Sequence, residues 1–290
     1  MDDSSSTIIH SNNTHNSGKK EEFNFPKALK ENQSFPEFDS NKKSKDIAKQ
    51  LESLRKVAEN LKEDDWCYPS LNKYLGLQYY HDAIIRQSDY RILQSRQWIN
   101  DSLIEFWYEY LTHNLYKEYS NQLLCLSPSL TQLIKMTDSM DEIRMILQPL
   151  NIEQRKLILM PLNDNMSYDY GGSHWSLLVF INDGDKSRLE YYDSSIQPQL
   201  SMMKIIGQKF SKLLSCDSDV HIEQCHLQED GYNCGIHLIC NSNAICQKYL
   251  LNDQRSIKDI ISLEQIKKFR LQLIDIIDRL KSESISLSPA

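Results

Sequence analysis

The sequence around one cysteine, Cys234, is typical of a reactive thiol. The stretch "LQEDGYNCGIHLICN", residues 227–241, places Cys234 at the start of an apolar, helix-like run, with Gly231 before it and Gly235 directly after it. Unpaired N–H groups in the first turn of a helix favour the thiolate, which is the nucleophilic form of cysteine. We expect Gly235 to leave room for an incoming carbonyl group and Gly231 to allow a tight approach of the loop. The pattern therefore indicates a cysteine nucleophile.

A nucleophilic cysteine needs a base, and the eight histidines are the candidates. Seven of them fall in the polar front segment (His10, His15), in stretches that read as helical (His81, His113), on a strand beside the loop (His221, His226) or on the nucleophile's own helix (His237). His174 is placed differently, because "YGGSHWSLLVF" sets it after a double-glycine turn at the mouth of a strand. Such a rigid edge can hold an imidazole in a fixed position.

Two further residues complete the candidate site. The next strand, "RLEYYDSS", ends in Asp193, and a short hairpin between the two strands would bring this carboxylate close to His174. Gln228 lies six positions before Cys234, and its side-chain amide, with the N–H of Cys234, could donate hydrogen bonds to the oxyanion of a tetrahedral intermediate. Each residue alone has an ordinary structural explanation. Their joint placement favours catalysis.

The surrounding pattern predicts an α+β domain. Periodic apolar residues with capping residues near their starts indicate helices at 98–116, 127–136, 140–150, 234–250 and 262–280. Short runs of branched and aromatic residues between turn signals indicate strands at 155–163, 174–182, 188–195 and 219–227. Helices come first, then a strand cluster, then helices again, which is unlike regular βαβ alternation.

Composition divides the chain into four regions. Residues 1–43 are rich in Ser, Asn, Lys and Glu, which predicts a disordered tail. Residues 44–70 predict a helical arm or linker, which either packs on the flank of the next domain or binds a partner. Residues 71–281 form the expected catalytic domain, and residues 282–290 a flexible C-terminal tail.

Charge and cysteine usage narrow the function class. With 33 Lys and Arg against 40 Asp and Glu, and no basic run, nucleic acid is not the expected partner. No apolar stretch is long enough to cross a membrane and the start does not resemble a signal peptide, so we expect an intracellular protein of the cytoplasm, the nucleus or both. Seven irregularly spaced cysteines indicate reduced thiols, and a zinc site is disfavoured because paired short spacings are missing around the candidate ligands Cys216, Cys225, His226 and Cys234. We expect the protein to bind no metal and no cofactor and to be a monomer.

The residues His174, Asp193, Gln228 and Cys234, in that order, resemble those of the Ulp-type, or sentrin-specific, cysteine proteases. Further matching segments are "RQSDYRIL", "QWINDSLIEFWYEYL", "LSPSLTQLIK", "GGSHWSLLVF" and "YYDSS". The resemblance is greatest to the deneddylase branch. It implies a papain-like α+β fold behind a disordered extension, and a thiol protease that removes a ubiquitin-like modifier, here the neddylation modifier, from conjugates such as cullins or matures its precursor.

The resemblance also implies roles for individual residues. His174 would activate Cys234, Asp193 would orient the imidazole, and Gln228 would help form the oxyanion hole. The chain departs from many family members at Asn233, where they have Asp.

Substrate contacts follow from the resemblance alone. Trp98 and Trp175 would line a narrow tunnel that admits only the modifier's terminal Gly-Gly, although each could equally be a half-buried core residue. Asp101 would contact the modifier's tail, and the loop from Asn163 to Gly172 would be a mobile segment that closes over it.

Three alternatives stay open. A SUMO- or ubiquitin-specific isopeptidase would use the same chemistry. An acetyltransferase with the same Cys, His and Asp would need a basic cofactor site, and no cluster of Arg or Lys suggests one. An inactive modifier-binding module is the weakest alternative, because all four catalytic positions are filled.

Overall fold

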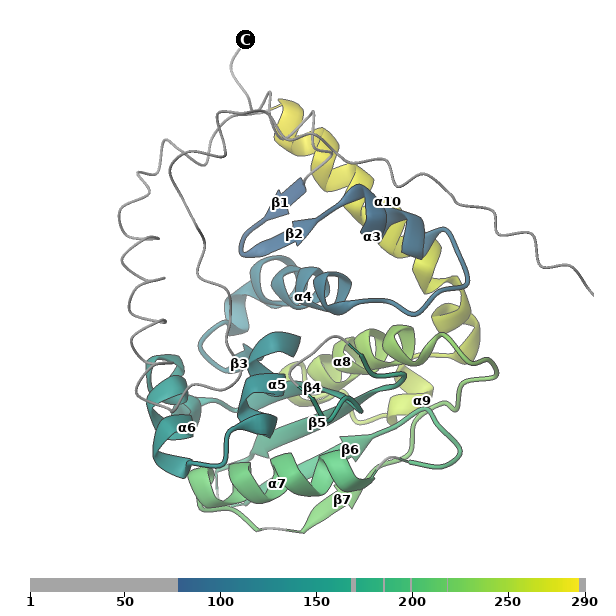
Figure 1. Ribbon diagram of the computed structural model, residues 1–290. Coiled ribbons are helices and arrows are strands. Elements are labelled where there is room, and N and C mark those ends of the chain that lie inside the picture. The colour runs from purple at the N-terminus through teal and green to yellow at the C-terminus, as the bar shows by residue number, and fades with distance from the viewer. Residues whose placement is uncertain (1–77, 168–170, 185, 199, 218, 287–290) are drawn as a thin grey trace, which may run out of the picture. The chain divides into compact units, whose positions relative to one another are not determined.

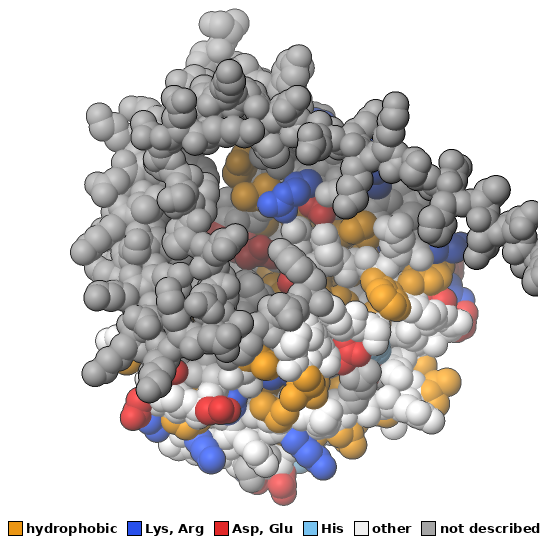
Figure 2. All heavy atoms as spheres, viewed as in Figure 1, with side chains coloured by type: hydrophobic (Ala, Val, Ile, Leu, Met, Phe, Trp, Pro, Cys, Tyr) orange, Lys and Arg blue, Asp and Glu red, His pale blue; other side chains and the backbone are white. Residues whose placement is uncertain are grey.

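The computed structural model describes residues 78–286, except 168–170, 185, 199 and 218. The predicted tail at 1–43 and the predicted arm at 44–70 lie outside this range. Within it, no helix has the length and apolar character needed to cross a membrane. On the face seen in Figure 2, acidic and basic side chains are interspersed over the described surface.

A five-stranded mixed sheet lies at the centre of the fold (Figure 1). Its order is β3 (Leu123–Cys125), β4 (Leu157–Asn163), β5 (Trp175–Asn182), β6 (Ser187–Tyr192) and β7 (Val220–Ile222). Strands β4, β5 and β6 pair antiparallel, whereas the short edge strands β3 and β7 run parallel to their neighbours. A separate antiparallel hairpin joins β1 (Gln78–Tyr80) to β2 (Ala83–Ile85).

Helices cover both faces of the sheet, as Figure 1 shows for α7 and α8. One layer contains α3 (Gln87–Leu93), α4 (Asp101–Tyr110), α8 (Cys234–Leu250), α9 (Ile257–Ile260) and α10 (Leu263–Ser286), and the other contains α5 (Pro128–Met136), α6 (Met140–Leu147) and α7 (Leu200–Leu214). Alternate residues of β4 enter different cores: Leu157 and Leu159 pack in the first, Ile158 and Met160 in the second. Burial on both faces explains why β4 and β5 read as continuous apolar runs.

The α+β architecture is confirmed, with corrections to several elements. The helix predicted at 98–116 begins only at Asp101, behind the N-cap Asn100, and gives way to a π-helix at Leu111–Leu115. The strand predicted at 219–227 is confined to β7. Helix α10 continues to Ser286, past the expected domain boundary at residue 281.

Other elements were not predicted. Helix α7 was missed, although its buried residues recur at helical spacing: Met202, Met203, Ile206 and Phe210. The placement of His81 in a helical stretch was wrong, because His81 occupies the turn between β1 and β2 with a left-handed φ of 51°.

Candidate active site

Cys234 is the first residue of α8 and its side chain is buried. The loop before it is organised by Asp230, whose carboxylate accepts hydrogen bonds from the backbone N–H groups of Tyr232 (3.0 Å) and Asn233 (2.8 Å) and from the side-chain amide of Asn233 (2.7 Å). The loop therefore turns sharply into the helix, and the thiol lies in the first helical turn, as the sequence predicts.

His174 lies just before β5 and Asp193 just after β6, so antiparallel pairing brings them to the same edge of the sheet. The two side chains meet at 2.6 Å, between His174 Nε2 and Asp193 Oδ1. The carboxylate is fixed further by the Tyr191 hydroxyl (2.8 Å, to Oδ2) and by the N–H of Ser195 (2.8 Å, to Oδ1). The imidazole is thus held by a buried, fully engaged carboxylate.

Electrostatics favour the charged forms of this pair. Burial pulls the pKa of His174 down, but hydrogen bonds and charge interactions with Asp193 and Cys234 outweigh it and raise that pKa to about 10. Burial also raises the pKa of Asp193, yet hydrogen bonds to the carboxylate outweigh this effect and leave its pKa below the usual value. Cys234 is therefore a second hydrogen-bonding partner of the imidazole.

Gln228 lies in the loop between β7 and α8, and it is tied to the strand end that carries Asp193. Its backbone N–H donates to the Ser194 carbonyl (2.8 Å), and its side-chain oxygen accepts from the Ser194 hydroxyl (2.8 Å). The side-chain nitrogen donates to the Asp230 carbonyl at 2.6 Å. The amide group has two N–H donors, so one further donor is available for an oxyanion.

The two glycines serve purposes other than those expected. A side chain at Gly235 would collide with Ile99 and approach Trp175 to 3.2 Å, so this glycine lets α8 pack against the segment before α4 and does not clear a path for substrate. Gly231 has open space around it, so no tight approach requires it. Its carbonyl instead accepts a 2.6 Å hydrogen bond from Trp98 Nε1.

The two tryptophans differ in exposure. Trp98 is 49% exposed. It lines a surface pocket together with Arg96, Gln97, Gly231 and Tyr232, and the last two of these belong to the loop that leads into Cys234. Trp175 is only 7% exposed, and its Nε1 donates to the Ile99 carbonyl at 3.1 Å. The Trp98 indole is therefore exposed to solvent, whereas Trp175 packs in the core.

Asp101 and Asn163 lie on different elements. Asp101 is exposed at the first position of α4, where partial loss of hydration raises the pKa of its carboxyl group. Asn163 ends β4, and its carbonyl accepts from Lys135 Nζ at 2.7 Å. Lys135 also binds the Asn165 carbonyl at 2.5 Å, and Gln132 binds that of Ser167 at 2.9 Å. Helix α5 therefore anchors the described first half of the loop that was expected to be mobile.

Asp164 in this loop was not anticipated as part of the site. Its carboxylate accepts from the backbone N–H groups of Ser173 (2.6 Å) and His174 (3.1 Å) and from the Ser173 hydroxyl (2.8 Å). The backbone that carries the imidazole is therefore pinned to the end of β4. The cue was local but weak: an aspartate soon after one strand, facing the start of the next.

Arg270 was also missed, because it comes from α10, far along the chain. Its guanidinium donates to the side-chain oxygen of Asn233 (2.8 Å) and to the carbonyls of Ile92 (3.0 Å), Gln97 (2.5 Å) and Tyr232 (3.4 Å). It thus joins the loop before Cys234 to the segment that carries Trp98. No spacing of residues in the sequence predicts this contact.

The arrangement can perform acyl transfer. A thiol at a helix start touches an imidazole, and a buried carboxylate holds the other ring nitrogen, which is the geometry of a cysteine nucleophile with its base and orienting group. The six cysteines in the described part of the chain are all free thiols. His237, near Cys234 on the same helix, is buried, and burial lowers its pKa to about 4, so it remains neutral at pH 7.

Comparisons with known proteins agree with this geometry. A family model described as the Ulp1 protease family, C-terminal catalytic domain, matches residues 97–283. Sentrin-specific protease 8 of Mus musculus is 33% identical over 208 residues, which cover 71% of this chain and 93% of that protein. NEDD8-specific protease 1 of Arabidopsis thaliana is 26% identical over 222 residues, which cover 71% and 94%. A crystal structure of a de-sumoylating protease shares the fold, with a TM-score of 0.54 at 17% identity over 72% of this chain and 92% of that one.

Proposed function

Because the chain belongs to the Ulp1 protease family of cysteine peptidases, we propose that it cleaves the neddylation modifier after its terminal Gly-Gly. It releases the modifier from conjugated proteins, cullins among them, and matures its precursor. In this proposal Cys234 is the nucleophile, His174 the base, Asp193 the orienting group and Gln228 an oxyanion donor. It acts as a monomer, in the cytoplasm, the nucleus or both.

The observation that carries the proposal is the position of His174 between a thiol and a carboxylate. The Asp193 contact of 2.6 Å fixes one ring nitrogen, which leaves the other to face Cys234. The raised pKa of His174 favours the imidazolium at neutral pH, and this form can give a proton to the departing amine.

The chemistry follows in two stages. The thiolate of Cys234 attacks the carbonyl carbon of the second glycine of the Gly-Gly, and the resulting oxyanion accepts hydrogen bonds from the free N–H of the Gln228 amide and the N–H of Cys234. His174 gives its proton to the departing amine, which leaves a thioester on Cys234. Water then attacks the thioester while His174 takes a proton from it, and the modifier leaves with a free carboxylate.

Substrate access is supported by the surface beside the nucleophile. The exposed face of Trp98 and the pocket that it shares with Gly231 and Tyr232 lie next to the loop that leads into Cys234. A glycine tail can lie flat against an indole, whereas a larger side chain would need more room. This favours a tail without side chains.

The choice of modifier is supported by the relatives. Several of them carry the name NEDD8-specific protease, although a ubiquitin-like-specific protease also matches, at 26% identity. Discrimination must come from residues before the Gly-Gly, where an unpaired polar group costs about 1 to 3 kcal/mol. Asp101 and the loop from Asn163 onward are our candidates for reading those residues.

The test is a panel of three matched modifier probes, for the neddylation modifier, SUMO and ubiquitin, each with an electrophile after Gly-Gly. We expect the neddylation probe to crosslink fastest, and Cys234→Ala to abolish crosslinking while it retains modifier binding. Equal rates on the SUMO probe would overturn the choice of modifier. Crosslinking that survives in Cys234→Ala would overturn the choice of nucleophile, with Cys225 the next candidate.

Asp101→Ala tests the reading of the tail separately. We expect the ratio of neddylation to SUMO rates to fall in this variant, while reaction of Cys234 with a small alkylating agent remains unchanged. An unchanged ratio would remove Asp101 from substrate recognition.

A further inference from the structure

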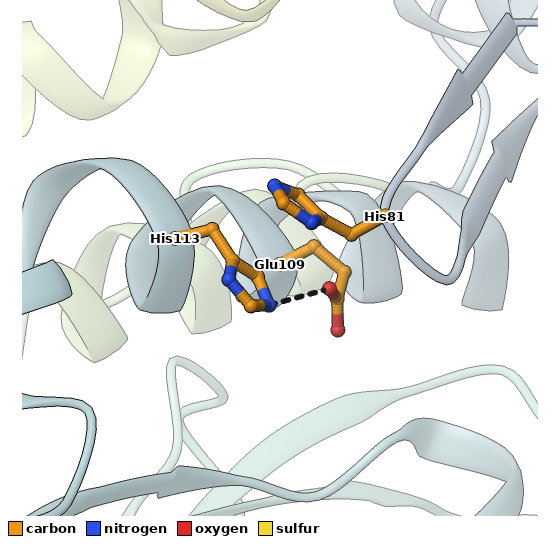
Figure 3. Close-up of side chains that lie close together, drawn as sticks. All are labelled: His81, Glu109 and His113. Atoms are coloured by element: carbon orange, nitrogen blue, oxygen red, sulfur yellow. Dashed lines mark ion pairs between the residues drawn. The ribbon is translucent and has the colours of Figure 1, made fainter.

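Away from the active site, three metal-ligating side chains of the described chain lie together. His81 comes from the turn of the β1–β2 hairpin, Glu109 from the last turn of α4, and His113 from the π-helix that follows. Figure 3 shows His81 reaching from the hairpin toward His113, whose Nε2 faces the Glu109 carboxylate. One potential ligand atom of each lies within 4.8 Å of the others.

Both histidines have an unusual local feature. His81 holds a left-handed φ of 51°, a conformation that costs energy for a residue with a side chain. His113 sits in a π-helical turn, which is rare and is often found at functional sites. Glu109 is half-buried, and its Oε2 lies 3.2 Å from His113 Nε2.

An ordinary ion pair explains only part of this arrangement. The rings of His81 and His113 stack with centroids 3.7 Å apart and planes 16° from parallel, so a proton on both rings would place like charges face to face. Glu109 can pair with one imidazole but does not satisfy both. A cation bound by all three would bring the two neutral rings and the carboxylate oxygen together without repulsion.

We propose that His81, Glu109 and His113 form a binding site for a divalent metal ion of the zinc class. Two imidazoles and one carboxylate are a ligand set that suits zinc, with the remaining position left to water. Zinc ligands lie about 3.3 Å apart in a tetrahedral site, so the rings must unstack and tilt inward from their present separation. His81 is exposed and His113 has a side chain that is 43% exposed, so no packed core opposes the rotation of either ring.

The position of the site indicates its purpose. Glu109 follows Asp101 by eight residues along α4, which places the site about 12 Å along the helix from the segment beside the nucleophile. The metal joins the β1–β2 hairpin to the end of α4 and takes no part in peptide cleavage. It acts as a clip, which stabilises the contact between these two elements.

The experiment uses full-length, tag-free protein with Cys234→Ala, so that neither a histidine tag nor the reactive thiol captures metal. Under a reducing agent that does not bind metals, Co²⁺ is titrated as a spectroscopic probe, and Zn²⁺ is then added in competition. We expect one equivalent of Co²⁺ with visible ligand-field bands, without the intense near-ultraviolet band of a cobalt thiolate, and displacement by Zn²⁺. Zinc at about 100 times its dissociation constant should raise the Tm by roughly 5 to 10 °C.

Variants assign the signal to the cluster. His113→Ala and His81→Asn should each abolish the bands and the Tm shift; Asn is chosen because it tolerates the left-handed backbone. His221→Ala, which removes another exposed imidazole, should leave both unchanged, and all three metal-free variants should melt close to the parent. The proposal fails if no stoichiometric binding occurs, if the bands show thiolate ligation, or if binding survives in His113→Ala and His81→Asn.

Discussion

The Nε atom of Arg270 donates a 2.8 Å hydrogen bond to the side-chain oxygen of Asn233, the residue immediately before the nucleophile. The same guanidinium lies over the Tyr232 ring, 5.4 Å from its centroid, and binds three backbone carbonyls. The planar guanidinium of Arg270, on a helix distant in sequence, therefore holds the loop before Cys234. The side chain that it binds at position 233 is a neutral amide.

This contact predicts the effect of Arg270→Lys. An ammonium group cannot form the same set of planar bonds, so we expect kcat/KM to fall by about tenfold or more.

The control for Arg270→Lys is Arg279→Lys, on the same helix. Arg279 donates instead to the Tyr110 hydroxyl of α4, at 2.7 Å. Wild-type kcat/KM in Arg270→Lys, or an equal loss in Arg279→Lys, would contradict a specific role for the planar contacts of Arg270.

The contact between Asp193 and His174 leads us to expect a changed pH dependence of kcat/KM in Asp193→Asn. Burial lowers the pKa of His174, but hydrogen bonds and charge interactions with Asp193 and Cys234 outweigh it and raise this pKa to about 10. The imidazolium therefore persists at neutral pH and is lost only as pH rises through about 10. Asp193→Asn removes the strongest raising interaction. We expect a rate about 10² to 10⁴ times lower and an alkaline limb of kcat/KM shifted toward the ordinary histidine pKa of about 6.5.

Circular dichroism must show that Asp193→Asn is folded. The same linkage has a sign for stability: the raised pKa of His174 contributes stability that is complete below about pH 6.5 and is lost as pH rises through about 10. The lowered pKa of Asp193 contributes stability that is lost as pH falls through it. An unchanged alkaline limb in the variant would contradict the role of Asp193.

Gln228 predicts a loss confined to the chemical step. Removal of an oxyanion donor costs about 10² to 10³ in kcat, so Gln228→Ala should lower kcat by this factor and leave KM nearly unchanged. Gln228→Glu keeps an acceptor for the Ser194 hydroxyl, which the wild-type side chain binds at 2.8 Å, but loses the amide donor. We therefore expect a similar loss of kcat from it.

Gln224→Ala is the matched control for Gln228, because Gln224 is an exposed residue of the same connecting segment. It should retain full activity. If Gln228→Glu retained wild-type kcat, the side chain would have only a structural role through Ser194.

Gly235 predicts a packing defect. A methyl group there would collide with Ile99, and overpacking of this kind costs about 1 to 3 kcal/mol in the free energy of unfolding. Gly235→Ala should therefore lower the urea midpoint, whereas Gly231→Ala, which has open space around it, should not. Ile99→Ala should partly rescue Gly235→Ala in a double-mutant cycle; full additivity would show that the two residues do not interact.

The positions of Cys234, His174 and Asp193 at element ends could be predicted because their signals are local. A polar loop that passes into an apolar helix, and strands bounded by turn residues, are visible within a few positions of each residue. Antiparallel pairing of adjacent strands then brings His174 and Asp193 to one edge.

The remaining features depend on contacts between distant segments. The reason for Gly235 was wrong because the direction of its missing side chain depends on where Ile99 packs. Arg270 was missed because its partners are set by how α10 docks. The separation of Trp98 from Trp175, one exposed and one buried, likewise depends on how the segment before α4 crosses α8.

Arg270 belongs to α10, the last helix of the described residues, well after Cys234 in the chain. A protein leaves the ribosome N-terminus first, so the loop before the nucleophile gains its anchor only when α10 has been made and has docked. A nascent chain therefore contains His174, Asp193 and Cys234 before it contains Arg270, whose guanidinium holds the loop before Cys234. The anchor is therefore absent until α10 has been synthesised, and a premature stop before Arg270 yields a protein that has Cys234, His174 and Asp193 but lacks this anchor.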